Sequence, residues 1–320
     1  MKTVGFVISK KNNEKRRALL PEDLPRIKNL DCIRLEKGYG ASIGLSDNDY
    51  QNVKFVSRDE VLNCDVIVDV KLGDAEYLND IDDHKILCGW AHAVQKLDFT
   101  SVAIKKKFTV IAWENILKNG RYIFYRNREI AGEAAIIHGI RHAEKAPYEL
   151  KVALIGNGQT AKGALRIFHG LGSEVDVYGR KLEAAFRHNM YDYDVIVNCV
   201  MWDTNRIDRL IYKEDIKKMK VGTLIIDVSC DPHLEIETSH PTTIDNPVYT
   251  VDGVVHYAVD NTPAMFPKSV SKILSNNFAD YYDELVTGIY SDEIKKAMAL
   301  EEGRILDQEI TKFRKLKGVL

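Results

Sequence analysis

The sequence has no long apolar run. Residues 152–155 and 223–226 are among its most hydrophobic stretches, whereas a membrane-spanning helix needs about 18 apolar residues. Residues 4–8 are also too few for the core of a signal peptide, and Lys10 and Lys11 follow them directly. We therefore expect a cytoplasmic protein with no membrane partner.

An excess of charge of one sign is also missing. The 45 Lys and Arg residues nearly balance the 47 Asp and Glu residues, which leaves a formal charge of -2. A protein that binds nucleic acid through bulk charge is strongly basic, so we expect no nucleic-acid partner. The five cysteines are widely spaced and form no C-x-x-C pair, which indicates reduced thiols rather than a disulfide framework or a metal site.

The chain is long enough for about two domains, since it has 320 residues and a domain usually comprises about 100 to 200 residues. Short β-branched runs, typical of buried parallel strands, alternate with segments of helical spacing, and this alternation is typical of doubly wound α/β sheets. The predicted strands are residues 4–8, 66–70, 86–88, 109–112, 152–155, 175–178, 195–197 and 224–226, and the predicted helices are residues 97–104, 130–143, 161–171 and 216–219.

The clearest domain boundary falls near residues 115–130, where we predict a loop at residues 118–121 and then a long helix. Residues 263–320 lack a comparable β run, so we predict only helices there, packed back on the first domain. The fold class we predict is α/β, with two doubly wound (Rossmann-like) domains and a cleft between them. Residues 1–126 plus 263–320 would form the substrate domain, and residues 127–262 the dinucleotide-binding domain.

A glycine-rich turn follows the predicted strand that ends at Ile155. Gly156 permits a tight turn, Gly158 lets the backbone approach a pyrophosphate, and Ala161 is small enough for close packing of the helix. The N–H groups of that helix's first turn would bind the phosphates. A lone G-x-G-x-x-A is weak, but its strand-turn-helix setting favours a dinucleotide site over an ordinary glycine-rich turn.

The turn after the next predicted strand indicates which dinucleotide binds. An NAD site usually has an acidic residue there, which holds the ribose hydroxyls. This sequence has Gly179, Arg180 and Lys181 instead. Cations would attract a 2′-phosphate, so we predict NADPH; a basic surface turn is the alternative, since Lys and Arg are common in such turns.

Three polar residues follow predicted strands in the first part of the chain: Arg16, Lys71 and His92. Ligands collect at strand ends in open α/β sheets. An arginine that forks onto a carboxylate, a lysine that polarises a carbonyl and a histidine that exchanges a proton near neutral pH suit a 2-oxo acid. Each residue alone is better explained by a structural or solvated role, and only their shared location favours a site.

Several segments, taken in chain order, carry a likeness to known proteins. They are N-E-K-R-R-A at residues 13–18, Lys71 at its strand end, W-A-H at residues 90–92, E-I-A-G at residues 129–132, I-D-V-S-C-D at residues 226–231, P-T-T at residues 241–243 and N-T-P-A at residues 261–264. Over nearly the whole chain they resemble the alanine dehydrogenase and transhydrogenase-like family.

This resemblance implies roles for single residues. Arg16 and Lys71 would contact the carboxylate and carbonyl of the substrate, His92 would be the acid/base group, and Asp231 would lie beside the reacting centre. From the residues alone, Asp231 is better explained as an ordinary turn carboxylate.

The resemblance also implies which residues meet the cofactor. Val200, Met201 and Thr262 would line the nicotinamide pocket. Arg128 stands where alanine dehydrogenases usually have a small hydroxyl residue, and Arg180 follows a glycine that replaces their ribose-binding aspartate. Both departures weaken the interpretation as a plain alanine dehydrogenase.

The reaction that the resemblance implies is NADPH-dependent reductive condensation of pyruvate with the side-chain amine of L-ornithine or L-lysine, which gives an N-(1-carboxyethyl) amino acid. The enzyme would be a homo-oligomeric oxidoreductase acting on CH–NH bonds of small molecules. One alternative is an alanine dehydrogenase, which uses ammonia. Another is a non-catalytic NADP-binding or transhydrogenase-like module, although a pure binder needs no acid/base group. Partners for the second amino acid remain unranked among Arg17, Arg126, Glu114 and Glu133.

Overall fold

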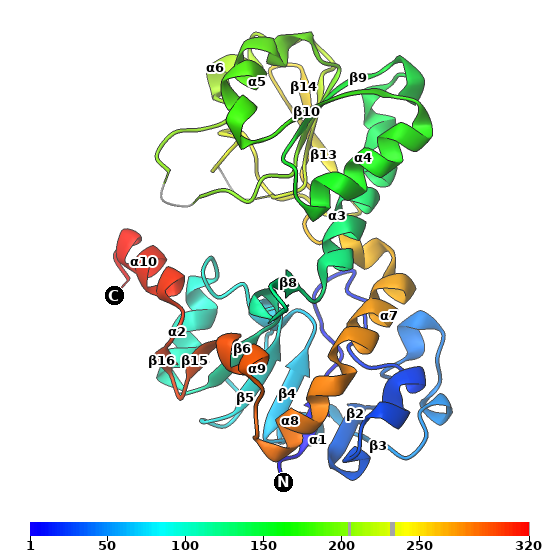
Figure 1. The fold of residues 1–320 in the computed structure, drawn as a ribbon, viewed down its shortest axis with the longest axis vertical. Helices are drawn as coiled ribbons and strands as arrows, with labels where there is room; N and C mark the ends of the chain where they lie inside the picture. Colours follow the sequence, from blue (N-terminus) through cyan, green and yellow to red (C-terminus); the bar gives the residue numbers. More distant parts are fainter. Residues whose placement is uncertain (204–205, 231–233, 320) are drawn as a thin grey trace. The chain divides into compact units, whose positions relative to one another are not determined.

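The computed structural model describes residues 1–203, 206–230 and 234–319. Its contacts divide the chain into two compact units. The first comprises Met1–Phe124 and Pro267–Leu320, and the second comprises Tyr125–Phe266 (Figure 1). Each unit is a mainly parallel sheet with helices on both faces, so the predicted α/β class with two Rossmann-like domains is confirmed.

The first unit is built on an eight-stranded sheet in the order β16-β15-β6-β5-β4-β1-β2-β3. β1 to β6 are parallel, whereas β15 and β16 run antiparallel to their neighbours. The strands are β1 (Val4–Phe6), β2 (Ile33–Glu36), β3 (Lys54–Val56), β4 (Val66–Asp69), β5 (Ile86–Gly89), β6 (Thr109–Ala112), β15 (Met298–Glu301) and β16 (Arg304–Ile305).

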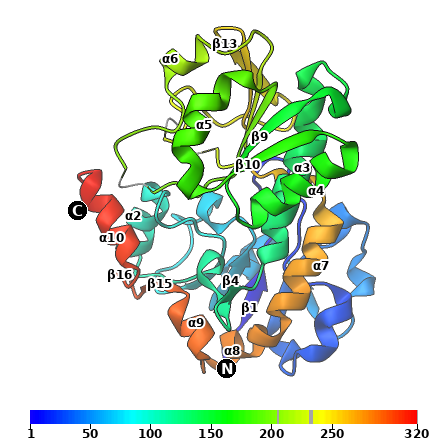
Figure 2. The ribbon, with the colours of Figure 1, turned by 45° about the horizontal axis from the view of Figure 1, so that its top comes forward.

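Helices cover both faces of this sheet. They are α1 (Arg58–Leu62), α2 (Leu97–Lys105), α7 (Pro267–Phe278), α8 (Tyr282–Thr287), α9 (Asp292–Lys296) and α10 (Gln308–Leu316). Because side chains alternate along a strand, one face presents Ile67 and Leu87 to a core shared with α2 and α10. On the other face Phe6 meets Tyr282 of α8, with ring centroids 5.0 Å apart, and both views show α7 and α8 lying against that face (Figures 1 and 2).

The C-terminal segment packs on the first unit, as predicted. The Ser275 hydroxyl of α7 donates to Asp23 at 2.5 Å, and the Tyr282 hydroxyl donates to the carbonyl of Ala18 at 2.7 Å. The prediction that this segment holds only helices is wrong, because β15 and β16 form a hairpin there that pairs with β6. Glu302 and Gly303 both have positive φ (47° and 77°), as in the tight two-residue turns of hairpins.

The predicted loop at residues 118–121 is also a hairpin, formed by β7 (Leu117–Lys118) and β8 (Arg121–Tyr122). Asn119 and Gly120 at its tip have φ of 53° and 76°. Asn-Gly is the favoured pair for such a turn because both residues tolerate the left-handed region.

The second unit is built on a six-stranded sheet in the order β10-β9-β11-β12-β14-β13, in which only β13 is antiparallel. α3 and α4 cover one face, and α5 and α6 cover the other (Figure 2). The elements are β9 (Lys151–Ile155), β10 (Glu174–Tyr178), β11 (Val195–Asn198), β12 (Leu224–Asp227), β13 (Val248–Val251), β14 (Val254–Tyr257), α3 (Tyr125–Gly139), α4 (Gln159–Leu171), α5 (Glu183–Asn189) and α6 (Lys213–Ile216). Among the described residues, no helix has the length and apolar character needed to span a membrane.

Candidate functional site

The three polar residues singled out from the sequence follow neighbouring strands. β5, β4 and β1 are adjacent and parallel, so their carboxyl ends lie at one edge of the sheet. Lys71 comes two residues after β4, His92 three residues after β5, and Arg16 lies in the irregular segment that follows β1. The topology therefore brings the three segments to the same edge of the first unit.

Close backbone packing joins the segments after β4 and β5. A Cβ atom on Gly89 would lie 1.8 Å from the carbonyl oxygen of Asp69, so only glycine fits at the end of β5. The amide of Gly73 donates to the carbonyl of Trp90 at 2.9 Å. The Lys71 turn and the His92 loop are therefore held against each other.

Arg16 is buried, with 2% of its surface exposed. Its guanidinium forms a two-pronged ion pair with Glu14, from Nε to Oε1 at 2.8 Å and from Nη2 to Oε2 at 2.5 Å. It also lies over the indole ring of Trp90, 4.9 Å from the centroid, and the indole N–H donates to the Tyr122 hydroxyl at 2.8 Å. These contacts fix the plane of the guanidinium beside the loop that carries His92.

Lys71 is buried beside two carboxylates. Its backbone amide donates to Asp69 Oδ1 at 2.8 Å, and its ammonium lies 3.5 Å from Asp74 Oδ2. Burial raises the pKa of Asp69 to about 6, although hydrogen bonds from the Lys71 amide and the Tyr77 hydroxyl favour the charged form. Asp69 thus fixes the backbone of Lys71, whereas Asp74 faces its ammonium.

His92 is partly buried and has a φ of 45°, in the left-handed region that few non-glycine residues adopt. Glu114 lies beneath this loop and accepts the Ala91 amide at 3.2 Å. Burial raises the pKa of Glu114, while the backbone amides of Ala91, His92 and Ala93 oppose the shift. Glu114 was a sequence candidate for holding the second amino acid, but its buried carboxyl instead supports the His92 loop.

The other candidates for the second amino acid are engaged elsewhere. Arg17 is buried, and its guanidinium donates to the carbonyls of Tyr39 and Arg16. Arg126 pairs with Glu133 at 3.0 Å on α3 of the second unit. Arg17 and Arg126 therefore both have protein partners in this structure. Asp231 lies outside the described residues.

The glycine-rich turn of the second unit has the shape that a pyrophosphate needs. Gly156 has a φ of 113°, which favours glycine, and its Cβ would lie 2.9 Å from the carbonyl oxygen of Cys199. A Cβ on Gly158 would meet open space, and Gly158 is the N-cap of α4. No side chain at Gly158 covers the turn, and the N–H groups in the first turn of a helix favour a phosphate, so these residues fit a dinucleotide.

Gly132 and Gly163, which were not predicted to have a role, hold α4 close to α3. A Cβ on Gly163 would lie 1.9 Å from the carbonyl oxygen of Glu129, and one on Gly132 would lie 2.0 Å from that of Thr160. α3 and α4 therefore cross with their backbones in contact. Ala161 is buried in the same core. The small residues of E-I-A-G at residues 129–132 are the sequence feature from which this close packing of α3 on α4 could have been predicted.

The turn after β10 presents cations. Arg180 and Lys181 are exposed there. The nearby carboxylate of Glu183 pairs with Arg206 and Arg187, each at 2.9 Å, and its pKa is lowered mainly by the hydrogen bond from Arg206. The charge of this carboxylate is thus balanced by two arginines, and the side chains of Arg180 and Lys181 face solvent.

The residues predicted to line a nicotinamide pocket lie in the second unit at different depths. Val200 and Met201 follow β11, the neighbour of β9; Val200 is partly buried, whereas Met201 is 83% exposed. Thr262 is buried, and its hydroxyl donates to the carbonyl of Ala131 in α3 at 2.9 Å. Arg128 is a partly buried residue of the same helix.

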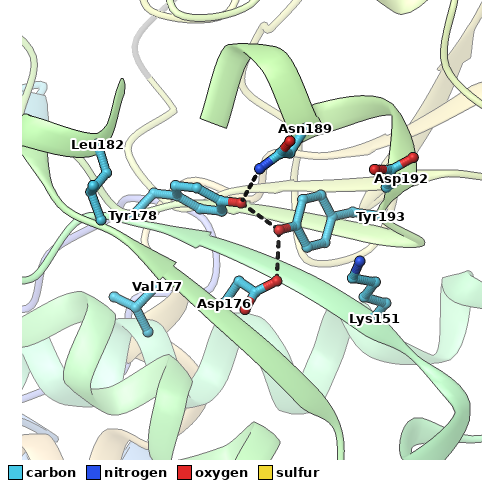
Figure 3. A pocket seen from close by; sticks show the side chains of 8 residues that line it. All are labelled: Lys151, Asp176, Val177, Tyr178, Leu182, Asn189, Asp192 and Tyr193. Carbon is cyan, nitrogen blue, oxygen red and sulfur yellow. Dashed lines mark hydrogen bonds between the residues drawn. The ribbon is translucent and has the colours of Figure 1, made fainter. Parts of the chain in front are cut away.

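A hollow of about 460 Å³ also lies along β10 (Figure 3). The Tyr178 and Tyr193 hydroxyls meet at 2.5 Å, and the Tyr193 hydroxyl donates to Asp176 at 2.7 Å, so these polar groups bind one another. The hollow extends from Lys151, which begins β9, to Tyr178, whose carbonyl accepts the Gly156 amide at 2.9 Å, and to Leu182 at the end of the Arg180 turn. The hollow therefore reaches the turn that carries Arg180.

Comparisons with known proteins agree with this architecture. The model of the alanine dehydrogenase/PNT N-terminal domain matches residues 7–125, and that of the C-terminal domain matches residues 179–311. The chain is similar to N(5)-(carboxyethyl)ornithine synthase of Clostridium botulinum, at 29% identity over 91% of this chain and 95% of the relative. It is also similar to N(5)-(carboxyethyl)ornithine synthase of Lactococcus lactis subsp. lactis, at 31% identity over 86% of this chain and 95% of the relative.

A solved L-alanine dehydrogenase has the same fold, with a TM-score of 0.82 and 21% identity over 99% of this chain and 100% of that one. Two Rossmann-like units, one with a dinucleotide turn, define an oxidoreductase that uses a nicotinamide dinucleotide. The chain belongs to the alanine dehydrogenase/PNT family.

Proposed function

We propose that this enzyme joins pyruvate to the side-chain amine of L-ornithine, or of L-lysine, and reduces the resulting imine with NADPH. The product is an N-(1-carboxyethyl) amino acid. The first unit, with its boundaries near residues 126 and 263, would bind the substrates, and the second would bind the dinucleotide. The naming of the two relatives as N(5)-(carboxyethyl)ornithine synthases supports this choice.

In this proposal Arg16 binds the pyruvate carboxylate, and Lys71 polarises the carbonyl by donating to its oxygen. The neutral amine attacks the carbonyl carbon and gives a carbinolamine. His92 moves the proton that the nitrogen loses to the carbonyl oxygen, which becomes the hydroxyl of the carbinolamine. It then gives this hydroxyl a proton taken from solvent, so that water leaves and the protonated imine forms. Bound NADPH supplies the hydride that reduces the imine carbon. Asp231 keeps its role beside the reacting centre only through the family resemblance.

Gly156, Gly158 and Ala161 would hold the pyrophosphate of the cofactor at the N-terminus of α4. Arg180 would pair with the 2′-phosphate, which supports NADPH rather than NADH. Val200, Met201, Thr262 and Arg128 would lie along the nicotinamide end.

The single observation that carries the proposal is the convergence of the Arg16, Lys71 and His92 segments at adjacent strand ends in the first unit. A carboxylate binder, a carbonyl polariser and an acid/base group are what condensation of a 2-oxo acid with an amine requires.

The test is to follow NADPH oxidation with pyruvate and, in separate assays, ornithine, lysine or ammonium, and to identify the product by mass. We expect turnover with ornithine or lysine and a product that contains both carbon skeletons. Turnover with ammonium alone, giving alanine, would show an alanine dehydrogenase. Binding of NADPH without turnover of any amine would show a non-catalytic module.

A further inference from the structure

Three lysine ammoniums converge on one carboxylate in the first unit. Lys96 lies 2.5 Å from Asp74 Oδ1, whereas Lys11 and Lys71 lie 3.0 Å and 3.5 Å from Asp74 Oδ2. Burial disfavours the charged carboxyl, but the Lys96 hydrogen bond and the charges of the other two lysines outweigh it and lower the pKa of Asp74. Asp74 is therefore ionised, and more than one cation surrounds it.

This cluster is formed by the same segments as the proposed pyruvate site. Lys11 lies in the segment after β1 that also carries Arg16. Lys71 and Asp74 flank the short turn after β4, and the amide of Lys96 donates to the carbonyl of His92 at 3.0 Å. The cluster therefore lies at the edge of the sheet where the condensation is proposed.

The exposed fraction of the side chain differs among the four residues of the cluster. The side chain of Lys71 is 7% exposed, that of Asp74 17%, that of Lys11 20% and that of Lys96 43%. Lys96 is thus the member of the cluster most open to solvent, and Lys71 is the least. Partly exposed ion pairs contribute little to stability, so a charged ligand can exchange with them at small cost.

We propose that Lys11, Lys96 and Asp74 form the subsite for the α-amino-acid end of the second substrate. The two ammoniums bind its α-carboxylate, and Asp74 accepts its α-ammonium. This inference rests on the proposed function, because ammonia would have no use for such a subsite. Lys11, Lys96 and Asp74 would then be the binding partners of the second substrate, for which the sequence alone ranks no residues.

The spacing agrees with the proposed reaction. The Lys71 ammonium, which would contact the carbonyl oxygen of pyruvate, lies 3.5 Å from Asp74. The four bonds from Cα to the side-chain nitrogen of ornithine span about 5 Å when extended. An amino acid whose α-ammonium contacts Asp74 can therefore bring its side-chain amine to a carbonyl held at Lys71.

The test compares three amines with saturating pyruvate and NADPH. Ornithine carries both α-groups, 5-aminopentanoate carries the carboxylate alone, and 1,4-diaminobutane lacks the carboxylate. In Lys96→Met we expect kcat/KM for ornithine to fall about tenfold further than that for 1,4-diaminobutane, because one charge-assisted contact is lost. 5-Aminopentanoate should follow ornithine, and the KM for pyruvate should change less than about twofold.

Lys10→Met is the matched control. Lys10 precedes Lys11, is 61% exposed and pairs with Glu76 at 3.4 Å, so its removal should leave the preference for ornithine intact. The subsite is overturned if wild type uses 1,4-diaminobutane as well as ornithine, or if Lys96→Met keeps the wild-type preference. If wild type turns over neither ornithine nor lysine, the proposed function fails, and the subsite fails with it.

Discussion

Gly73 packs directly against the carbonyl group of Ala91: a Cβ atom added to Gly73 would lie 2.2 Å from that oxygen. Gly73 lies two residues after Lys71, and Ala91 immediately precedes His92. The absence of a side chain at residue 73 therefore sets the distance between two proposed catalytic segments.

Gly73→Ala should destabilise the protein by about 1 to 3 kcal/mol, because either the turn or the loop must move. The same movement should lower kcat. Urea unfolding and steady-state rates measure the two effects. Gly170→Ala is the control: Gly170 lies in α4 with open space around its Cβ position, so its replacement should stabilise by up to about 1 kcal/mol. A Gly73→Ala protein as stable and active as wild type would show that the contact is unimportant.

His92→Asn should lower kcat by about a hundred- to ten-thousandfold, the range for loss of a general acid/base group. Asparagine tolerates positive φ, so the loop should keep its conformation. NADPH affinity, measured by fluorescence titration, should hardly change, since His92 belongs to the first unit.

His84→Asn makes the same exchange at an exposed histidine with a φ of 62°, and its kcat should stay within about twofold of wild type. A merely structural His92 predicts a lower melting temperature with normal turnover of the folded protein. That result would remove His92 from the mechanism.

Arg180→Ala should erase most of the preference for NADPH over NADH. A charge-assisted contact to a phosphate contributes about 1.5 to 3 kcal/mol before solvent screening, which is roughly ten- to more than a hundredfold in affinity. The measurement is kcat/KM for both cofactors below saturation. Lys218→Ala, at another exposed cation of the second unit, should change neither value. Equal efficiency of wild type with NADH and NADPH would show that Arg180 does not bind a 2′-phosphate.

Local sequence patterns were sufficient to predict the fold class, because parallel strands that are buried on both faces appear in the sequence as short, continuous apolar runs. The run at residues 66–70 became β4 for this reason. β2 escaped prediction since its sequence, I-R-L-E, alternates with charged residues and is partly exposed. β15 escaped because its apolar residues, Met298, Ala299 and Leu300, are helix formers rather than β-branched, and only the E-G pair at its turn marks the hairpin.

The candidate site was predictable only in part. Arg16, Lys71 and His92 each stand beside a recognisable strand, so their type and place were visible in the sequence. The pairing of Lys11 and Lys96 through Asp74 was not, because these residues come from three segments that only the tertiary fold brings together. Glu114 was seen as a charged candidate, but its burial beneath the His92 loop depends on packing that sequence patterns do not describe.

Asp69→Asn should remove a pH dependence from the stability of the protein. The pKa of Asp69 is about 6 in the folded chain against an ordinary value of 3.8, because the carboxyl is buried. The folded state thus binds this proton more tightly than the unfolded state does. The resulting stability is complete below about pH 4 and is lost as the pH rises through about 6, by up to about 3 kcal/mol.

The replacement should keep both local hydrogen bonds. The amide oxygen of asparagine can accept the Lys71 amide, as Asp69 Oδ1 does, and its NH₂ group can donate to the Tyr77 hydroxyl. The free energy of unfolding of Asp69→Asn, measured by urea titration, should therefore rise relative to wild type between pH 4.5 and pH 7.

Asp65→Asn is the control, and its free energy of unfolding relative to wild type should change with pH in the opposite direction. Burial opposes ionisation of Asp65, but hydrogen bonds from the backbone and hydroxyl of Thr3, at 2.7 Å and 2.9 Å, outweigh it and lower its pKa. Its stabilising contribution is present above the ordinary pKa and is lost in acid, so the variant should lose stability relative to wild type as the pH rises. If the difference between Asp69→Asn and wild type is independent of pH while that of Asp65→Asn is not, Asp69 titrates normally, and its burial does not control its charge.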